Sequence, residues 1–165
     1  MRFWLSSSLR AYTSLSKSKT GALMVFERST KLGDIASTGV IIDASPSTFL
    51  IRNIFFEPAP LHDGALVIRD GRLYAAGCIL PLTKKSVSSA LGTRHRAGIG
   101  LTEQSDAVVV IVSEETGAIS VAIGGMLNHD VSDGDLRDIL TTEFLPSGSS
   151  SDDKIISRLV RRMKK

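Results

Sequence analysis

The chain has few of the residues that build disulfide scaffolds or membrane spans. Its 165 residues include one cysteine, Cys78, so neither a disulfide framework nor a cysteine-based zinc site can form. No stretch approaches 18 consecutive apolar residues, which excludes a transmembrane helix within this sequence. The hydrophobic fraction of 42% and the charged fraction of 22% are typical of one globular domain. A lone cysteine in an apolar run predicts a buried side chain in a reducing, cytoplasmic protein.

Acidic residues are missing from both ends of the chain. The net charge of +3 and the pI of 9.2, taken alone, would suggest a nucleic-acid-binding protein. However, all 17 acidic residues lie in residues 27–153, where the 10 basic residues leave a net charge of −7. No aromatic side chain interleaves with the C-terminal basic residues to stack on bases. We therefore expect an acidic domain with two basic ends and no nucleic-acid partner.

Three segments are expected along the chain. Residues 1–20 are basic and serine-rich, which weakly resembles a transit peptide but favours a short amphipathic helix. Residues 21–145 are expected to form the main folded domain. Residues 146–165 begin with PSGSSSDD, the composition of a flexible linker, and end in a basic amphipathic helix.

Residues 21–145 predict an α/β (α+β) fold in which helices flank a mixed central sheet. Apolar runs bounded by turn residues indicate the strands, and Asp70-Gly71 between two of them is typical of a hairpin. The expected strands are Gly21–Glu27, Gly39–Ile42, Ala65–Arg69, Arg72–Leu80, Ala107–Ser113 and Ala118–Ile123. The expected helices are Ser45–Phe56, with Ser45 as N-cap and Pro46 in its first position, Thr93–Gln104 and Ser132–Phe144. No GxGxxG or GxxxxGK[ST] motif supports a Rossmann or P-loop fold.

A basic cluster, Gly92–Ala97 (GTRHRA), lies where a helix is expected to begin. A helix N-terminus offers free N–H groups to anions, and two arginines and a histidine add charge and donors. Thr93 could cap the helix and donate its hydroxyl. The cluster therefore indicates a phosphate site without a P-loop, and a solvated basic turn is the alternative.

Two further clusters carry carboxylates. Asp63, in Leu61–Ala65 (LHDGA), could bind a divalent metal or take a proton from a hydroxyl nucleophile, although Asp-Gly is also an ordinary turn. Ser113–Gly117 (SEETG) follows the expected central strand, at a sheet edge where ligand sites commonly lie. Its glutamates could hold a phosphate-bridging metal or lie in a solvated hairpin turn.

Together the clusters resemble the diadenylate cyclase family. The DGA of Asp63–Ala65 and the RHR of Arg94–Arg96 are similar to its two signature motifs. The matching text is GALMVFE (21–27), PLHDGALVI (60–68), GTRHRAGIGLTE (92–103) and SEETGAISVA (113–122). The similarity is greatest to the membrane-anchored bacterial type, in which transmembrane helices and a linking helix precede this domain. Residues 2–19 resemble that linking helix, so the chain is either a soluble cytoplasmic member or the cytosolic domain of a protein attached to the membrane through a preceding segment.

The resemblance implies a reaction. Two ATP molecules condense into cyclic di-AMP and two pyrophosphates, as each 3′-hydroxyl attacks the α-phosphate of the other ATP. It also implies a requirement for Mg²⁺, Mn²⁺ or Co²⁺, and an active site completed by a face-to-face homodimer, with a higher oligomer as a further option. A catalytically silent sensor of ATP or cyclic dinucleotide is the alternative function.

The resemblance also assigns roles to single residues. Asp63 is expected near the metal and the attacking hydroxyl, and Gly64 and Ala65 where the nucleotide approaches the backbone. The phosphate-binding residues are expected to be Thr93, Arg94, His95, Arg96 and Ala97, with Ser113 near the phosphates, Glu115 at the metal and Leu80 at the adenine. Ile79 replaces a tyrosine found in some relatives, leaving only an aliphatic contact for the base.

Overall fold

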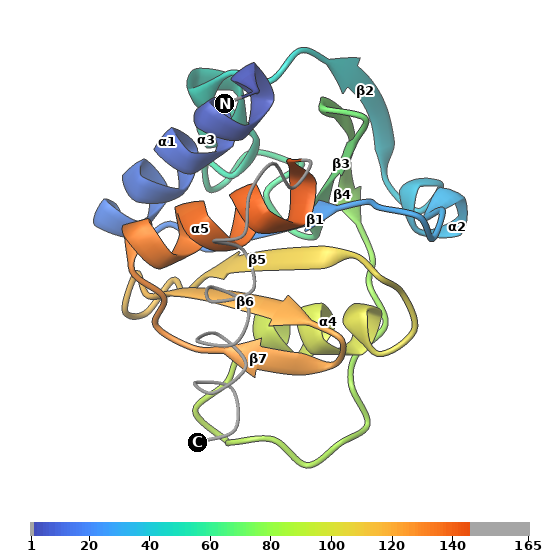
Figure 1. Ribbon diagram of the computed structural model, residues 1–165, viewed down its shortest axis with the longest axis vertical. Coiled ribbons are helices and arrows are strands. Elements are labelled where there is room, and N and C mark those ends of the chain that lie inside the picture. The colour runs from blue at the N-terminus through green and yellow to red at the C-terminus, as the bar shows by residue number, and fades with distance from the viewer. Residues whose placement is uncertain (1, 146–165) are drawn as a thin grey trace.

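The apolar runs of the sequence form the centre of one sheet in the computed structural model, which describes residues 2–145 (Figure 1). The seven strands are β1 (Ala22–Phe26), β2 (Val40–Ala44), β3 (Ala65–Arg69), β4 (Arg72–Cys78), β5 (Val108–Val112), β6 (Ile119–Ile123) and β7 (Met126–Asn128). Their order across the sheet is β2-β4-β3-β1-β5-β6-β7. Strand β1 runs parallel to β3, and the other neighbours pair antiparallel. The expectation of a mixed sheet flanked by helices is confirmed.

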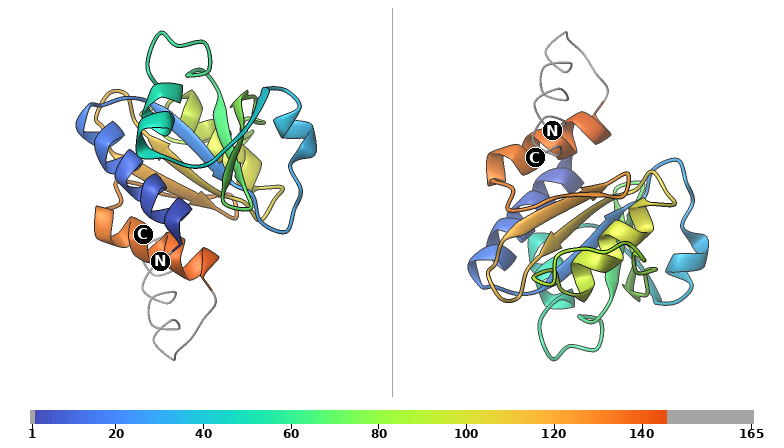
Figure 2. Two further views of the ribbon diagram at one scale, coloured as in Figure 1. Left: turned by 90° about the horizontal axis from the view of Figure 1, so that it is seen from above. Right: turned by 90° about the horizontal axis from the view of Figure 1, so that it is seen from below.

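Helices cover both faces of this sheet (Figure 2). The helices are α1 (Phe3–Lys17), α2 (Gly33–Ala36), α3 (Thr48–Ile54), α4 (Thr93–Thr102) and α5 (Asp133–Phe144). Side chains alternate between the faces along a strand, so Met24 and Phe26 of β1 pack with α1, α3 and α5. Leu23 and Val25 point to the other face, where α2 and α4 contribute to the core.

The N-terminal helix α1 is part of the core. Leu5 and Tyr12 are fully buried, and Tyr12 lies with its ring centroid 6.4 Å from that of Phe26. Phe3, the first residue of this helix, is 70% exposed, whereas Leu5 two residues later is fully buried. Among residues 2–145, no helix has the length and apolar character needed to cross a bilayer.

Local signals predicted several elements. The two residues between β3 and β4, Asp70 and Gly71, both have positive φ (49° and 73°), the geometry that an Asp-Gly hairpin turn requires. Helix α5 begins after Ser132, whose hydroxyl accepts from the backbone N–H of Asp135 at 3.1 Å.

Other local expectations are wrong. Helix α3 begins at Thr48 and its N-cap is Ser47, not Ser45, because the Ser47 hydroxyl accepts from the Leu50 N–H at 3.0 Å. Phe49, in the first turn of this helix, is 80% exposed. Strand β7 was not expected; it is a three-residue edge strand that pairs only with β6. The predicted linker and C-terminal helix (146–165) lie outside the described residues.

Glycines in α4 determine how closely it packs. A Cβ atom on Gly98 would lie 2.9 Å from the Ile111 side chain of β5. A Cβ atom on Gly100 would lie 2.1 Å from the Pro81 carbonyl oxygen, in the segment that follows β4. The helix therefore lies directly against the sheet and against residues 81–83, and its first turn is held beside the ends of β4 and β5.

Candidate functional site

A cleft of about 810 Å³ opens at one edge of the sheet, beside the first turn of α4. Because β5 is antiparallel to β1 and β4 is antiparallel to β3, the ends of β4 and β5 meet the beginnings of β1 and β3 at this edge. Its walls come from five places in the sequence: Leu23, residues 62–64, residues 78–80 with Leu82, residues 89–95 with Ala97, and residues 112–115. The three clusters singled out in the sequence thus converge on one cavity.

The basic cluster begins helix α4. Its N-cap is Gly92, not Thr93, and no side chain caps the helix, so its first N–H groups have no side-chain acceptor. Thr93, Arg94, His95 and Ala97 line the cleft. Free amides at a helix N-terminus beside cationic side chains favour an anion.

Arg96 has a different position from Arg94. It does not line the cleft; its Nε donates to the Leu91 carbonyl at 3.4 Å. The Arg96 carbonyl accepts from the N–H of Thr83 at 3.1 Å. Both partners lie in the segment between β4 and α4, so Arg96 contacts that segment and not the interior of the cavity.

His95 is 6% exposed and its Nε2 atom has no hydrogen-bond partner among the described residues. Burial lowers the pKa of this imidazole, and the nearby His129 and Arg94 lower it further, so the ring is neutral at pH 7. The His129 ring lies 6.0 Å away and its Nδ1 is 2.9 Å from the Ser120 hydroxyl. An oxygen atom of a bound phosphate would satisfy the unpartnered nitrogen of His95.

The DGA cluster lies on the opposite wall. Asp63 is exposed to the cleft, and Gly64 has φ of +109°, with the position of a Cβ atom only 2.8 Å from the backbone of residues 77 and 78. Only glycine fits there, since a side chain would meet both strain and backbone. Ala65 is fully buried as the first residue of β3 and does not line the cleft.

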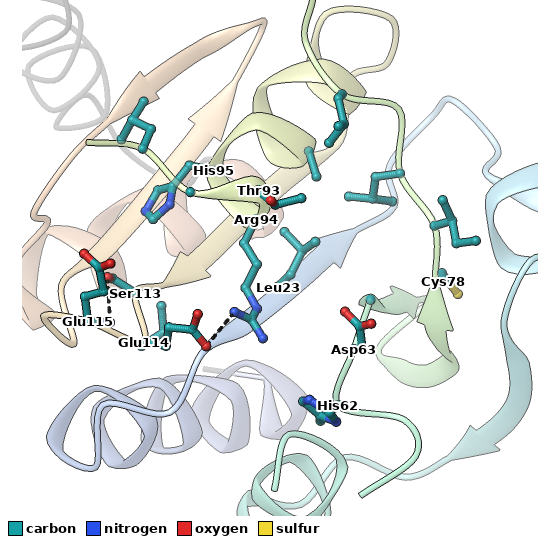
Figure 3. Close-up of a pocket in the computed structure, with 18 of the residues that line it drawn as sticks. Leu23, His62, Asp63, Cys78, Thr93, Arg94, His95, Ser113, Glu114 and Glu115 are labelled. Carbon is teal, nitrogen blue, oxygen red and sulfur yellow. Dashed lines mark hydrogen bonds and ion pairs between the residues drawn. The ribbon is translucent and has the colours of Figure 1, made fainter. Parts of the chain in front are cut away.

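The SEETG cluster forms a tight turn after β5. The Ser113 hydroxyl accepts from the N–H groups of Glu115 and Thr116, each at 3.3 Å. Glu114 and Glu115 are exposed and line the cleft. Glu114 Oε2 lies 3.2 Å from Arg94 Nη1, an ion pair that Figure 3 marks with a dashed line.

An apolar wall completes the cleft. It includes Leu23, Leu80 and the rim residues Ile79 and Leu82, of which Ile79 is 69% exposed. Cys78 also lines it, and burial raises the pKa of this thiol to about 11, so it is not ionised at neutral pH. Two residues of the cleft carry no sequence signal of their own: the apolar run around Leu23 indicates only a buried strand, and the resemblance assigns the metal to Glu115 and no role to Glu114.

The carboxylates of the cleft suit a divalent ion that is shared with phosphates. Asp63 and Glu115 lie on opposite sides of Arg94 in Figure 3, and residues 2–145 contain no group of three or more potential ligands. Mg²⁺ prefers oxygen ligands and is usually bound by one or two carboxylates together with substrate phosphates. The donors present fit that arrangement, because the protein supplies only part of a coordination shell.

A mixed α/β domain with a basic helix start, an apolar wall and carboxylates around one cleft defines a nucleotide-binding class of protein. Residues 9–127 match the family described as "DisA bacterial checkpoint controller nucleotide-binding". The chain belongs to this family.

The curated relatives and the solved structures agree with this family assignment. "Cyclic di-AMP synthase CdaA" of Bacillus subtilis is 42% identical over 136 residues, which are 82% of this chain and 50% of the relative. "Diadenylate cyclase" of Listeria monocytogenes is 42% identical over 79% of this chain and 48% of its own length. The structure of DacA from Staphylococcus aureus, an N166C/T172C double mutant, matches with a TM-score of 0.85 and 41% identity over 87% of this chain and 96% of that one. The chain spans about half the length of these two curated relatives.

Proposed function

We propose that this chain is a diadenylate cyclase domain, which condenses two ATP molecules into cyclic di-AMP and releases two pyrophosphates. The main observation is the convergence of Asp63, Arg94, His95, Ser113 and Glu115 on one cleft. The curated relatives named cyclic di-AMP synthase or diadenylate cyclase support the same activity.

The cleft offers a distinct wall to each part of ATP. Leu23, Leu80 and the rim residue Ile79 form an apolar side for the adenine. The amides that begin α4, with Thr93 and Arg94, face the triphosphate, and His95 lies in the same wall. Fixed donors of this kind stabilise the charge of phosphoryl-type transition states, for which alignment and neutralisation are the main requirements.

Asp63 acts on the nucleophile. As the 3′-oxygen of one ATP bonds to the α-phosphorus of the other, the bond from that phosphorus to the pyrophosphate breaks, and the Asp63 carboxylate takes the hydroxyl proton. A divalent ion such as Mg²⁺, Mn²⁺ or Co²⁺, held by Asp63 or Glu115 with the phosphates, would neutralise charge and lower the pKa of the hydroxyl.

A second copy of the chain completes the site. Each cleft is proposed to bind one ATP, and each ATP supplies both a nucleophile and an electrophile, so two clefts must face each other. The exposed apolar side chains at the rim, Ile79 and Leu82, suit burial in such a contact. We expect the rate per chain to rise with protein concentration until the dimer is saturated.

The activity is tested by incubating the purified chain with ATP and Mn²⁺ and measuring cyclic di-AMP by mass spectrometry. Asp63→Asn should abolish the product. Asp70→Asn is the matched control, because Asp70 lies in the β3–β4 turn, where asparagine also tolerates positive φ. Full activity of Asp63→Asn would refute the role of Asp63, and ATP binding without any product would favour the silent sensor.

We also propose that the chain functions on the cytosolic side of a membrane, within a longer membrane-anchored protein. In this proposal residues 1–20 link the domain to the anchor, residues 21–145 carry out catalysis, and residues 146–165 are a C-terminal tail. Support comes from the half-length coverage of the curated relatives and from a Bacillus cereus structure titled as a hypothetical membrane spanning protein (TM-score 0.74, 44% identity over 77% of this chain and 63% of that one). Fractionation of the native cells, with an antibody against this domain, should find it with the membranes.

A further inference from the structure

The guanidinium group of Arg94 lies against the backbone of Gly21. A Cβ atom on Gly21 would lie 2.6 Å from Nη1, 2.7 Å from Cζ and 3.1 Å from Nη2 of Arg94. These distances are too short for any real contact, so the guanidinium occupies the space that a side chain at residue 21 would need. Gly21 directly precedes β1 and has no positive φ, so space rather than backbone conformation is what glycine provides there.

Glu114 contacts the same guanidinium. Its Oε2 lies 3.2 Å from Arg94 Nη1 and its side chain is 61% exposed, whereas that of Arg94 is 24% exposed. Figure 3 shows Glu114 and Arg94 side by side in the cleft. Because ion pairs with a solvated carboxylate are weak, a multiply charged phosphate can replace Glu114 without moving the arginine far.

We propose that Gly21 is a positioning residue for Arg94, and through it for the triphosphate. Its missing side chain lets the guanidinium lie within the cleft, where a phosphate can exchange with Glu114. The inference rests on the proposed function, in which the cleft binds the phosphates of ATP.

Gly21 differs from the glycines that only allow helix packing. The three atoms nearest to a Cβ atom at Gly100 belong to backbone, so an added methyl there must displace the chain. At Gly21 all three belong to the end of the Arg94 side chain, which can move while the fold stays intact. Gly21→Ala should therefore shift the guanidinium and leave the stability of the domain nearly unchanged.

The test is a double-mutant cycle. Wild type, Gly21→Ala, Arg94→Ala and the double variant are titrated by calorimetry with α,β-methylene ATP, in which a methylene group replaces the bridging oxygen and prevents turnover. Gly33→Ala is the matched control, because a Cβ atom there meets nothing within 4 Å. Thermal melts of all variants establish that they are folded.

We expect Gly21→Ala to raise the dissociation constant about tenfold and Gly33→Ala to change it less than twofold, a difference of about 1.4 kcal/mol for the tenfold step. In the Arg94→Ala background, Gly21→Ala should change affinity less than twofold, because the two residues act through one group. An undiminished effect in that background, or a Gly21→Ala variant that binds like Gly33→Ala, would overturn the proposal.

A spectroscopic measurement separates this proposal from the proposed function. The NMR signal of the Arg94 Nε–H, assigned by its loss in Arg94→Ala, should shift in Gly21→Ala and stay in place in Gly33→Ala. If the wild type fails to bind the analogue, the proposed function fails, and the position of this signal still decides whether Gly21 positions Arg94. An unshifted signal in Gly21→Ala refutes the inference even if the wild type binds.

Discussion

Replacing Glu27 should reveal how strongly one buried ion pair stabilises the central strands. Glu27 follows β1 and its side chain is 1% exposed. Its carboxylate accepts from Arg69 Nε and Nη2, both at 2.9 Å, and from the Leu32 N–H at 2.9 Å. The Arg69 guanidinium also lies 3.9 Å from the centroid of the Tyr74 ring. The carboxylate therefore connects β1, β3 and the segment before α2.

The loss of unfolding free energy depends on which buried groups lose their partner when Glu27 is replaced. Removing one partner of a buried ion pair costs about 3–5 kcal/mol. Glu27→Gln keeps one acceptor oxygen, and Arg69 is 23% exposed and can gain water, so the loss should be smaller, about 2 kcal/mol. With a urea dependence of about 2 kcal/mol per molar, the unfolding midpoint should fall by about 1 M.

The stabilisation by Glu27 should decrease as the pH falls into the acidic range. Burial alone would raise the pKa of Glu27, but the hydrogen bonds from Arg69 and Leu32 and the charges of Arg69 and Lys31 outweigh it and lower the pKa below 4.5. The folded state then releases the proton more readily than the unfolded chain. The stabilisation is therefore complete above about pH 4.5 and is lost as the pH falls through the folded-state value.

Urea unfolding at pH 7 and in the acidic range provides the assay. The difference between wild type and Glu27→Gln should shrink below pH 4.5, since protonated Glu27 resembles glutamine. Asp43→Asn is the control: Asp43 pairs with Arg72 at the surface, with side chains 59% and 47% exposed, and should cost less than about 1 kcal/mol. An equal difference at both pH values, or a control as destabilised as Glu27→Gln, would refute the reasoning.

Three further substitutions have expected outcomes. Gly100→Ala should lower the free energy of unfolding by about 2 kcal/mol, because the new methyl group meets the Pro81 carbonyl. This loss already includes the gain of about 1 kcal/mol in helix propensity that alanine brings. A free energy of unfolding in urea equal to or above that of wild type would contradict this expectation. Wild type should lose stability as the pH falls below about 6.5, because the lowered pKa of His95 makes the unfolded chain bind the proton before the folded one, and His95→Gln should reduce this loss. Thermal melts in a pH series measure the loss, and a dependence of stability on pH equal to that of wild type would exclude His95 as its cause. Ser132→Ala should cost about 1 kcal/mol through loss of the cap on Asp135, and a melting temperature equal to that of wild type would argue against the cap.

Local physics explains which elements were predictable. Strands β1, β3 and β5 are short runs of apolar residues, and the positive φ angles at Asp70 and Gly71 are intrinsic to that residue pair. The N-cap of α3 was not predictable in the same way, because two serines two residues apart both satisfy the local rule. Strand β7 has only three residues and exists through its pairing with β6.

The fold was needed to know which residues line the cleft. Sequence motifs predicted Asp63, Arg94 and Ser113, which all line it, but could not distinguish Arg94 from Arg96, since helical rotation and the packing of α4 decide which side chain enters the cavity. Ala65 carries the DGA motif and still lies in the core, where it belongs to the same buried cluster as the cleft residues Leu23 and Leu80.

The sequence by itself determined most of the strands, the hairpin, the position of α5 and the chemical groups available for a phosphate site, because these depend on neighbouring residues. The tertiary structure alone decided that β1 runs parallel to β3 and that Gly21 and Glu114 lie against Arg94. These contacts join residues far apart in the chain, and they arise from strand pairing and from steric packing of side chains.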